Sequence, residues 1–230
     1  MGQKVNPIGF RIGTFLPWKS RWFSEDSKYK DYLLEDIEIR RTLMEKLKIA
    51  GIIQVELERL PKSLVVILTV SRPGVVIGRG GSGLEEIKKI ILEVIDRFKK
   101  SKSRSASQVS DGQSGQSLKI DLRVNEVRNP EISAHLVATR IAFELERRFP
   151  HRRVVNRAME RVMQAGAKGV KIILSGRIAG ADIARVEKYH LGSVPTQTLR
   201  ERIDYARSTA LLKRGCVGVK VYIHKKAEKD

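Results

Sequence analysis

Apolar and polar residues follow two spacings in the first half of the chain, one typical of helices and one of strands. Helical spacing predicts an amphipathic helix over residues 32–50, with apolar positions at Leu33, Ile37, Leu43, Leu47 and Ile49. Two β-like stretches, 52–58 and 64–70, flank Pro61 and predict a hairpin. A short apolar run then precedes a second long helix over 84–100, whose stripe is Ile87, Ile91, Val94 and Phe98.

The second half of the chain is predicted to place two helices on a sheet. Strict alternation over 118–124 indicates a half-buried strand, and Pro130 opens a helix with two apolar stripes, one formed by Ile132, Leu136 and Phe143. Pro150 separates this helix from the next, at 152–165. Three further β-like stretches remain, the last of them a pair of strands: 170–175, 183–191 and 199–223. The fold class is therefore α+β.

Two segments show neither spacing. Residues 101–117 are rich in Ser, Gly and Gln, so they cannot offset their ordering entropy and are expected to form a mobile insertion. Residues 1–24 combine Gly, Pro and basic residues with Trp18, Trp22 and Phe23, which predicts an extended arm. The rings either stack on nucleic-acid bases or anchor the arm to its own core.

The net charge restricts the class of partner. The chain of 230 residues has 45 Lys and Arg against 26 Asp and Glu, which gives +19 and a pI near 10.2. Its length allows one or two domains, and 41% hydrophobic residues are enough for a core. A globular chain with such a cationic surface is expected to bind a polyanion, and nucleic acid is the first candidate.

Enzymatic, metal-binding and membrane functions find little support in the sequence. Cys216 is the only cysteine, and its strand-like, glycine-flanked surroundings predict a small buried residue. The histidines form no HExxH, and neither GxxxxGK[ST] nor GxSxG occurs. The first residues lack the apolar stretch of an export signal. We expect no catalysis, no cofactor, no metal and no membrane association.

A glycine-rich loop at residues 78–83 matches two patterns. As GxGxxG it would be a dinucleotide fingerprint, but the three residues between Gly74 and Gly78 are too short for the strand that such a turn follows. As GxxG between a short helix and a long one, it is typical of the KH loop, which clamps a single-stranded sugar-phosphate backbone. A plain glycine turn is the structural alternative. The order of elements favours the KH interpretation.

Arginines recur on one face of the predicted helix at 152–165. Arg153, Arg157 and Arg161 lie four residues apart, opposite the apolar positions Val155, Met159 and Val162. Further cations precede them: Arg147, Arg148, His151 and Arg152. Such a face is often merely solvated, but the charge of the whole chain favours RNA. Binding through these groups should weaken with salt.

Several motifs resemble a known family: MGQKVNP, RPGVVIGRGG, GAKGVKIILSGRIAGADIAR, VPTQTLRERIDYA and GVKVYIHK. The chain is similar to the family of bacterial-type small-subunit ribosomal protein three. The resemblance implies a type II KH domain followed by a C-terminal α+β domain, in the head of the small ribosomal subunit. It also implies binding to ribosomal RNA and to ribosomal proteins ten and fourteen, a position lining the messenger RNA channel, and a cytoplasmic or organellar location.

The family's basic helix is implicated in unwinding messenger RNA, and here Arg152 and Arg153 match its paired arginines. Asn156 replaces a lysine usual in the family, so the strength of unwinding stays open. An enzyme acting on nucleic acid, with the lyase-like side activity of some relatives, is the alternative function.

These considerations divide the chain and select its RNA-binding residues. We expect an arm at 1–24, a KH domain at 25–125, a C-terminal domain at 126–225 and a tail at 226–230. The predicted RNA contacts are Lys4, Arg11, Lys19, Arg72, Gly78, Arg79, Gly80, Gly81, Lys88, Arg148, Arg152, Arg153, Arg157 and Arg161.

Overall fold

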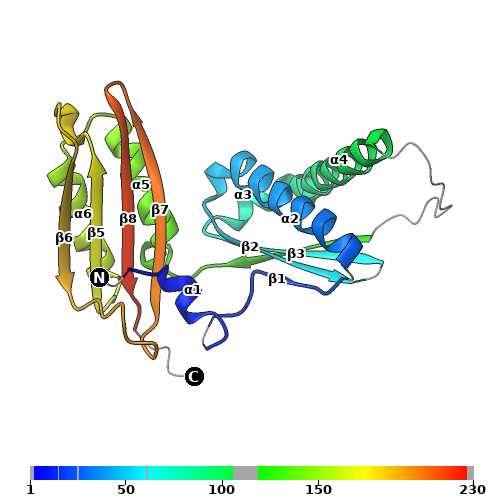
Figure 1. The fold of residues 1–230 in the computed structure, drawn as a ribbon, viewed down its shortest axis with the longest axis horizontal. Coiled ribbons are helices and arrows are strands. Elements are labelled where there is room, and N and C mark those ends of the chain that lie inside the picture. Colours follow the sequence, from blue (N-terminus) through cyan, green and yellow to red (C-terminus); the bar gives the residue numbers. More distant parts are fainter. Residues whose placement is uncertain (1–2, 15, 25, 61, 106–118, 227–230) are drawn as a thin grey trace. The chain divides into compact units, whose positions relative to one another are not determined.

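The computed structural model of the chain describes residues 3–14, 16–24, 26–60, 62–105 and 119–226. The chain divides into two compact units (Figure 1). One is continuous in sequence, Lys19–Arg128, whereas the other combines Met1–Trp18 with Asn129–Asp230.

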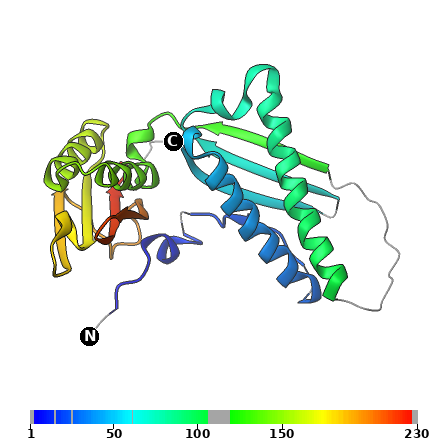
Figure 2. The same cartoon turned by 90° about the horizontal axis from the view of Figure 1, so that it is seen from above.

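The continuous unit is a four-stranded sheet of order β1-β2-β3-β4, with the long helices α2 and α4 side by side over one face (Figure 2). β2 and β3 form the predicted hairpin, whereas β3 and β4 are parallel. Parallel neighbours need a long crossover, which α3 and α4 supply. The elements are β1 (Ser20–Arg21), α2 (Asp26–Lys46), η1 (Lys48–Ala50), β2 (Ile52–Leu60), β3 (Ser63–Val70), α3 (Pro73–Ile77), η2 (Arg79–Gly81), α4 (Ser82–Ser105) and β4 (Lys119–Glu126).

The apolar stripe of α4 packs as its spacing predicts, whereas that of α2 does not. Ile87, Ile91 and Val94 are almost fully buried against the sheet. On α2, however, Leu33 and Ile37 are exposed, and the buried side chains include Asp36. The prediction was therefore wrong for Leu33 and Ile37, whereas Leu43 is buried as expected. Asp36 lies inward in this part of α2 because it has an ionic partner on the sheet.

Helix α4 continues to Ser105, beyond the predicted end at residue 100. The polar segment therefore begins as helical backbone. Residues 106–118 lie outside the described residues, so the mobile insertion stays a prediction there.

The second unit is an antiparallel sheet of order β6-β5-β8-β7, with α5 and α6 packed against it (Figure 1). This confirms the prediction of two helices on a sheet. The elements are α1 (Pro7–Arg11), η3 (Pro130–Ile132), α5 (Ala134–Glu146), α6 (His151–Gln164), β5 (Gly169–Gly176), η4 (Ile178–Gly180), β6 (Arg185–Gly192), β7 (Ile203–Leu212) and β8 (Gly215–His224).

Side chains alternate along β8, and this alternation overturns the expectation for Cys216. Val217, Val219, Val221 and Ile223 point into the core beneath α5, so Cys216, one residue earlier, is exposed. On α5, Phe143 is 51% exposed although its apolar stripe was expected to be covered.

The amino-terminal segment is more ordered than an extended arm. Asn6 caps α1 by accepting a hydrogen bond from the Ile8 amide at 2.9 Å, and Pro7 starts the helix. Ser20 and Arg21 then pair in parallel with β2. No helix in the described part of the chain is long and apolar enough to cross a membrane.

Candidate nucleic-acid interface

The glycine loop connects α3 to α4, which is the context of a KH loop and not of a dinucleotide fingerprint, since a helix and not a strand precedes it. Gly80 and Gly81 have φ angles of 63° and 85°, a left-handed conformation that favours glycine. The exposed Arg79 stands beside them.

The glycines of this loop have two different roles. A Cβ on Gly83 would lie 2.5 Å from the Val76 carbonyl oxygen, and one on Gly78 would lie 2.9 Å from the Gly83 amide nitrogen. These two glycines let α3 and α4 approach each other. A Cβ on Gly80 or Gly81 would meet nothing within 4 Å. The backbone there is bare and open to a ligand.

Two further cations predicted for this site are accessible. Arg72 stands at the start of α3, and Lys88 lies on α4. Both side chains are exposed. The first turn of α4 follows the loop directly, and the positive end of the helix dipole favours an anion there, although Glu85 in the same turn opposes it.

Helix α6 separates its apolar and basic residues onto different faces. Val154, Val155, Met159 and Val162 are buried against the sheet and α5, whereas Arg153, Arg157 and Arg161 are exposed. Among the described residues, neither Arg153 nor Arg157 forms an ion pair. Their charges are therefore available to phosphates.

Arg148 occupies the turn between α5 and α6 with a φ of 63°. Its amide donates to Leu145 O at 2.9 Å, and the Phe149 amide donates to Glu144 O at 3.2 Å. These bonds close a Schellman motif, in which glycine usually takes the position of Arg148. The exposed Arg148 is thus held at a backbone angle unfavourable to its residue type.

Glu187 on β6 fixes the beginning of α6. Its carboxylate lies 3.2 Å from His151 Nε2 and 2.8 Å from Arg185 Nε, and accepts a hydrogen bond from the Tyr189 hydroxyl at 2.5 Å. The Tyr189 hydrogen bond lowers the pKa of Glu187, burial opposes this, and the charges of His151, Arg185 and Arg152 add to it. The charge of Arg152 therefore acts on the Glu187 carboxylate of β6, whereas the charge of Arg153 does not.

The structure removes Arg11 from the predicted RNA contacts. Its side chain is 1% exposed, and its guanidinium donates to the carbonyl oxygens of Pro7, Thr196, Thr198 and Glu201 at 2.7–3.1 Å. Burial lowers its pKa. The cation fastens α1 to the segment before β7. Lys4 and Lys19, by contrast, are exposed.

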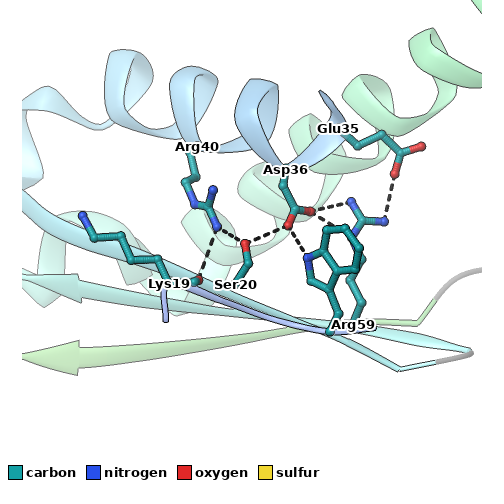
Figure 3. A network of polar contacts seen from close by, with 7 residues as sticks. Lys19, Ser20, Glu35, Asp36, Arg40 and Arg59 are labelled. Atoms are coloured by element: carbon teal, nitrogen blue, oxygen red, sulfur yellow. Dashed lines mark hydrogen bonds and ion pairs between the residues drawn. The ribbon is translucent and has the colours of Figure 1, made fainter. Parts of the chain in front are cut away.

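A buried polar network holds the start of the continuous unit (Figure 3). Asp36 is fully buried and accepts from Arg59 at 2.7 Å, from Trp22 Nε1 at 2.8 Å and from Ser20 at 3.0 Å. Glu35 pairs with Arg59 at 2.9 Å, and Arg40 reaches the Ser20 hydroxyl. Trp22 is thus anchored on its own core, whereas Trp18 and Phe23 are 66% and 92% exposed.

The sequence interpretation did not identify the aromatic side chains beside the arginine face. Phe143 and Phe149 are half-exposed at the α5–α6 turn, and Arg147 stacks 4.2 Å from the Phe143 ring centre. Exposed phenylalanines next to a run of arginines were the available signal. In the described part of the chain, no cluster of His, Cys, Asp and Glu could hold a metal ion.

Comparison with known proteins places these features in a family. A KH domain model matches residues 38–132, and a model described as the C-terminal domain of ribosomal protein S3 matches residues 141–223.

Three relatives are each named small ribosomal subunit protein uS3. That of Persephonella marina is 44% identical, with 98% of this chain and 90% of the relative covered. That of Caldicellulosiruptor saccharolyticus is 43% identical, with 98% and 92% covered, and that of Leuconostoc citreum is 39% identical, with 98% and 95% covered. The chain, with its KH unit and its two-helix antiparallel unit, belongs to the family of small ribosomal subunit protein uS3.

Proposed function

We propose that this chain is a structural component of the small ribosomal subunit that binds ribosomal RNA and contacts messenger RNA. Its relatives are named as ribosomal proteins and not as enzymes. These names agree with the expectation, drawn from the sequence, that the chain has no catalytic function. The chain acts on the ribosome, next to ribosomal RNA and other small-subunit proteins, with ribosomal proteins ten and fourteen as its neighbours.

The bare backbone at Gly80 and Gly81 carries the proposal. Open space surrounds it, and the loop lies in a chain with a net charge of +19. A sugar-phosphate backbone approaches closely only where side chains are absent, and Arg79 with the first turn of α4 supplies the attraction. The KH loop therefore takes single-stranded RNA.

The arginine face of α6 is the second RNA contact in this proposal. Arg153, Arg157 and Arg161 project from one rigid helix, so they meet phosphates of a strand along its length. Messenger RNA is the strand we assign to this face. With Asn156 in place of a lysine, the helix unwinds structured messenger RNA less strongly than it would with the lysine present.

Reconstitution of small subunits tests the proposal. The full chain should co-sediment with small subunits after a high-salt wash, and subunits assembled without it should take it up from solution. A chain that remains in the free fraction under both conditions would contradict the ribosomal assignment. Cross-linking within the reconstituted particle should join RNA to residues 72–90 and 147–161.

A further inference from the structure

A cavity of about 290 Å³ opens between α5 and α6, beside the arginine face. We infer that it accepts one nucleobase of a single-stranded RNA, with guanine preferred over uracil. This inference rests on the proposed function and adds to it a base-reading pocket, since the arginine face alone would contact only phosphates.

The walls of the cavity suit a flat aromatic ligand. Phe143, Phe149 and Val154 provide apolar surface, and the two phenylalanines are 51% and 52% exposed. The Arg147 guanidinium covers one side of Phe143 at 4.2 Å and offers its own second face for stacking. The half-exposed Phe143 ring, held in place by a stacked guanidinium, is already arranged for a base before it binds, and Phe149 adds a second half-exposed ring.

The charges around the cavity place phosphates at its rim. Arg153 and Arg157 line it and, among the described residues, form no ion pair. Arg140 also lines the cavity, but its charge is neutralised by Glu131, whose Oε2 lies 2.6 Å from Arg140 Nη1. Arg147 at the end of α5 likewise forms no ion pair among the described residues. The uncompensated cations therefore lie at the end of α5 and on α6, where a strand would place the phosphates next to an inserted base.

Glu144 supplies the means to distinguish bases. Glu144 lines the same cavity, where a carboxylate repels phosphate but accepts hydrogen bonds from the N–H groups of a base. Guanine presents two adjacent N–H donors on its Watson–Crick edge. Uracil presents one N–H between two carbonyl oxygens, which the carboxylate repels. Guanine is consequently the base that satisfies Glu144.

The size of the cavity favours a base over a peptide. At about 290 Å³ it lies at the lower end of small-molecule pockets, which span roughly 300–1,000 Å³. An acidic peptide would use the same arginines, but it leaves Glu144 opposite a like charge. A single nucleotide fits both the volume and the mixed charges.

Fluorescence anisotropy with the full chain tests the inference. The probes are labelled heptauridylate and the same strand with a central guanosine, both at one near-physiological salt concentration. The guanosine strand should bind about fivefold or more tightly, and Phe149→Ala should lose at least that factor for it. Glu144→Gln should reduce the preference while leaving the binding of heptauridylate equal or stronger.

Leu211→Ala is the matched control, because Leu211 is a 70% exposed apolar side chain of the same unit, on β7. It should bind both strands as the unchanged chain does, and circular dichroism should show that all variants are folded. If binding depends on Arg153 but not on Phe149 or the central base, the pocket inference fails and the proposed function stands.

Two other outcomes are distinguishable. If neither strand binds even at low salt, the proposed RNA-binding function itself fails. If Phe149→Ala leaves RNA binding unchanged but removes a neighbouring protein from reconstituted subunits, the cavity belongs to a protein partner, and the nucleobase assignment is overturned.

Discussion

Arg148 combines an exposed cation with a left-handed backbone at the end of α5. A non-glycine residue in this conformation costs roughly 1–2 kcal/mol, a cost that glycine at the same position avoids. Backbone strain of this kind clusters at functional sites.

Replacing Arg148 should therefore separate stability from binding. Relative to Arg148→Ala, Arg148→Gly should raise the free energy of unfolding by about 0.5–1 kcal/mol. Both variants should bind RNA more weakly than the unchanged chain, to the same extent. Urea denaturation and RNA titration measure the two effects, and an Arg148→Gly variant that is less stable than Arg148→Ala would show that the backbone is not strained.

The neighbouring arginines Arg152 and Arg153 should also differ. Because the charge of Arg152 acts on Glu187 and Tyr189 of β6, Arg152→Ala should lower stability more than it weakens RNA binding. Arg153→Ala should leave stability nearly unchanged and weaken RNA binding severalfold, since it removes a cation that forms no ion pair with any residue the structure describes. Titration and thermal unfolding of both variants check this. If Arg152→Ala lost more RNA binding than Arg153→Ala, Arg152 and not Arg153 would be the RNA contact.

Among the elements, β2 to β8 and α4 followed from the local pattern, whereas β1 and the buried face of the first turns of α2 did not. Alternation and helical spacing depend on neighbours in sequence, and they located every strand of the hairpin and of the antiparallel sheet. The buried face of α2 depends on the ion pair between Asp36 and Arg59, 23 residues away. A burial pattern that treats carboxylates as exposed cannot anticipate such a partner.

The KH loop is the element whose charge is easiest to reverse. Arg79→Asp combined with Gly80→Asp should weaken binding of single-stranded RNA by about 1 kcal/mol or more, because repulsion replaces attraction. Arg97→Asp combined with Asn125→Asp changes the net charge equally at exposed positions of the same unit. Equal loss in both variants would mean that the loop is only a turn.

The anchoring of α6 on β6 should depend on pH. The folded pKa of Glu187 lies below its ordinary value of 4.5, so its ionised form stabilises the fold above that pH and loses this effect as the pH falls through the folded pKa. Glu187→Gln should therefore be less stable than the unchanged chain at neutral pH, and the difference should shrink below about pH 4.5.

Urea unfolding across this pH range measures the difference. Glu160→Gln, which removes an exposed carboxylate from α6, is the control and should follow the unchanged chain throughout. A constant difference between Glu187→Gln and the unchanged chain, down to strongly acidic pH, would exclude the ionised carboxylate as the cause.

At the scale of the whole molecule, the net charge predicted an RNA partner but not which cations are available. Arg11 is buried by carbonyl groups up to 190 residues away, and the cavity beside α6 exists only once α5 and the turn have folded. Distant contacts of this kind leave no local pattern in the sequence. The motifs shared with the family, by contrast, are local, and they identified the family correctly.

The salt dependence of RNA binding should report the available cations. Each phosphate contact on a single strand contributes about 0.7 to the slope of log K against log salt. Replacing both Arg153 and Arg157 by Ala should reduce the slope by about 1.4. Arg123→Ala should leave it unchanged, because Asp121 already pairs with Arg123 at 3.3 Å. Equal slopes for all three proteins would argue against phosphate contacts on α6.

The attachment of Arg11 to the carbonyls of Thr196, Thr198 and Glu201 has a consequence for biosynthesis. Chains emerge from the amino terminus, and domains generally fold as units. The first eighteen residues must therefore wait for their docking site until nearly the whole polypeptide has been translated, while Lys19–Arg128 is already complete. A nascent chain stalled before Thr196 should expose α1 to protease and protect the KH unit.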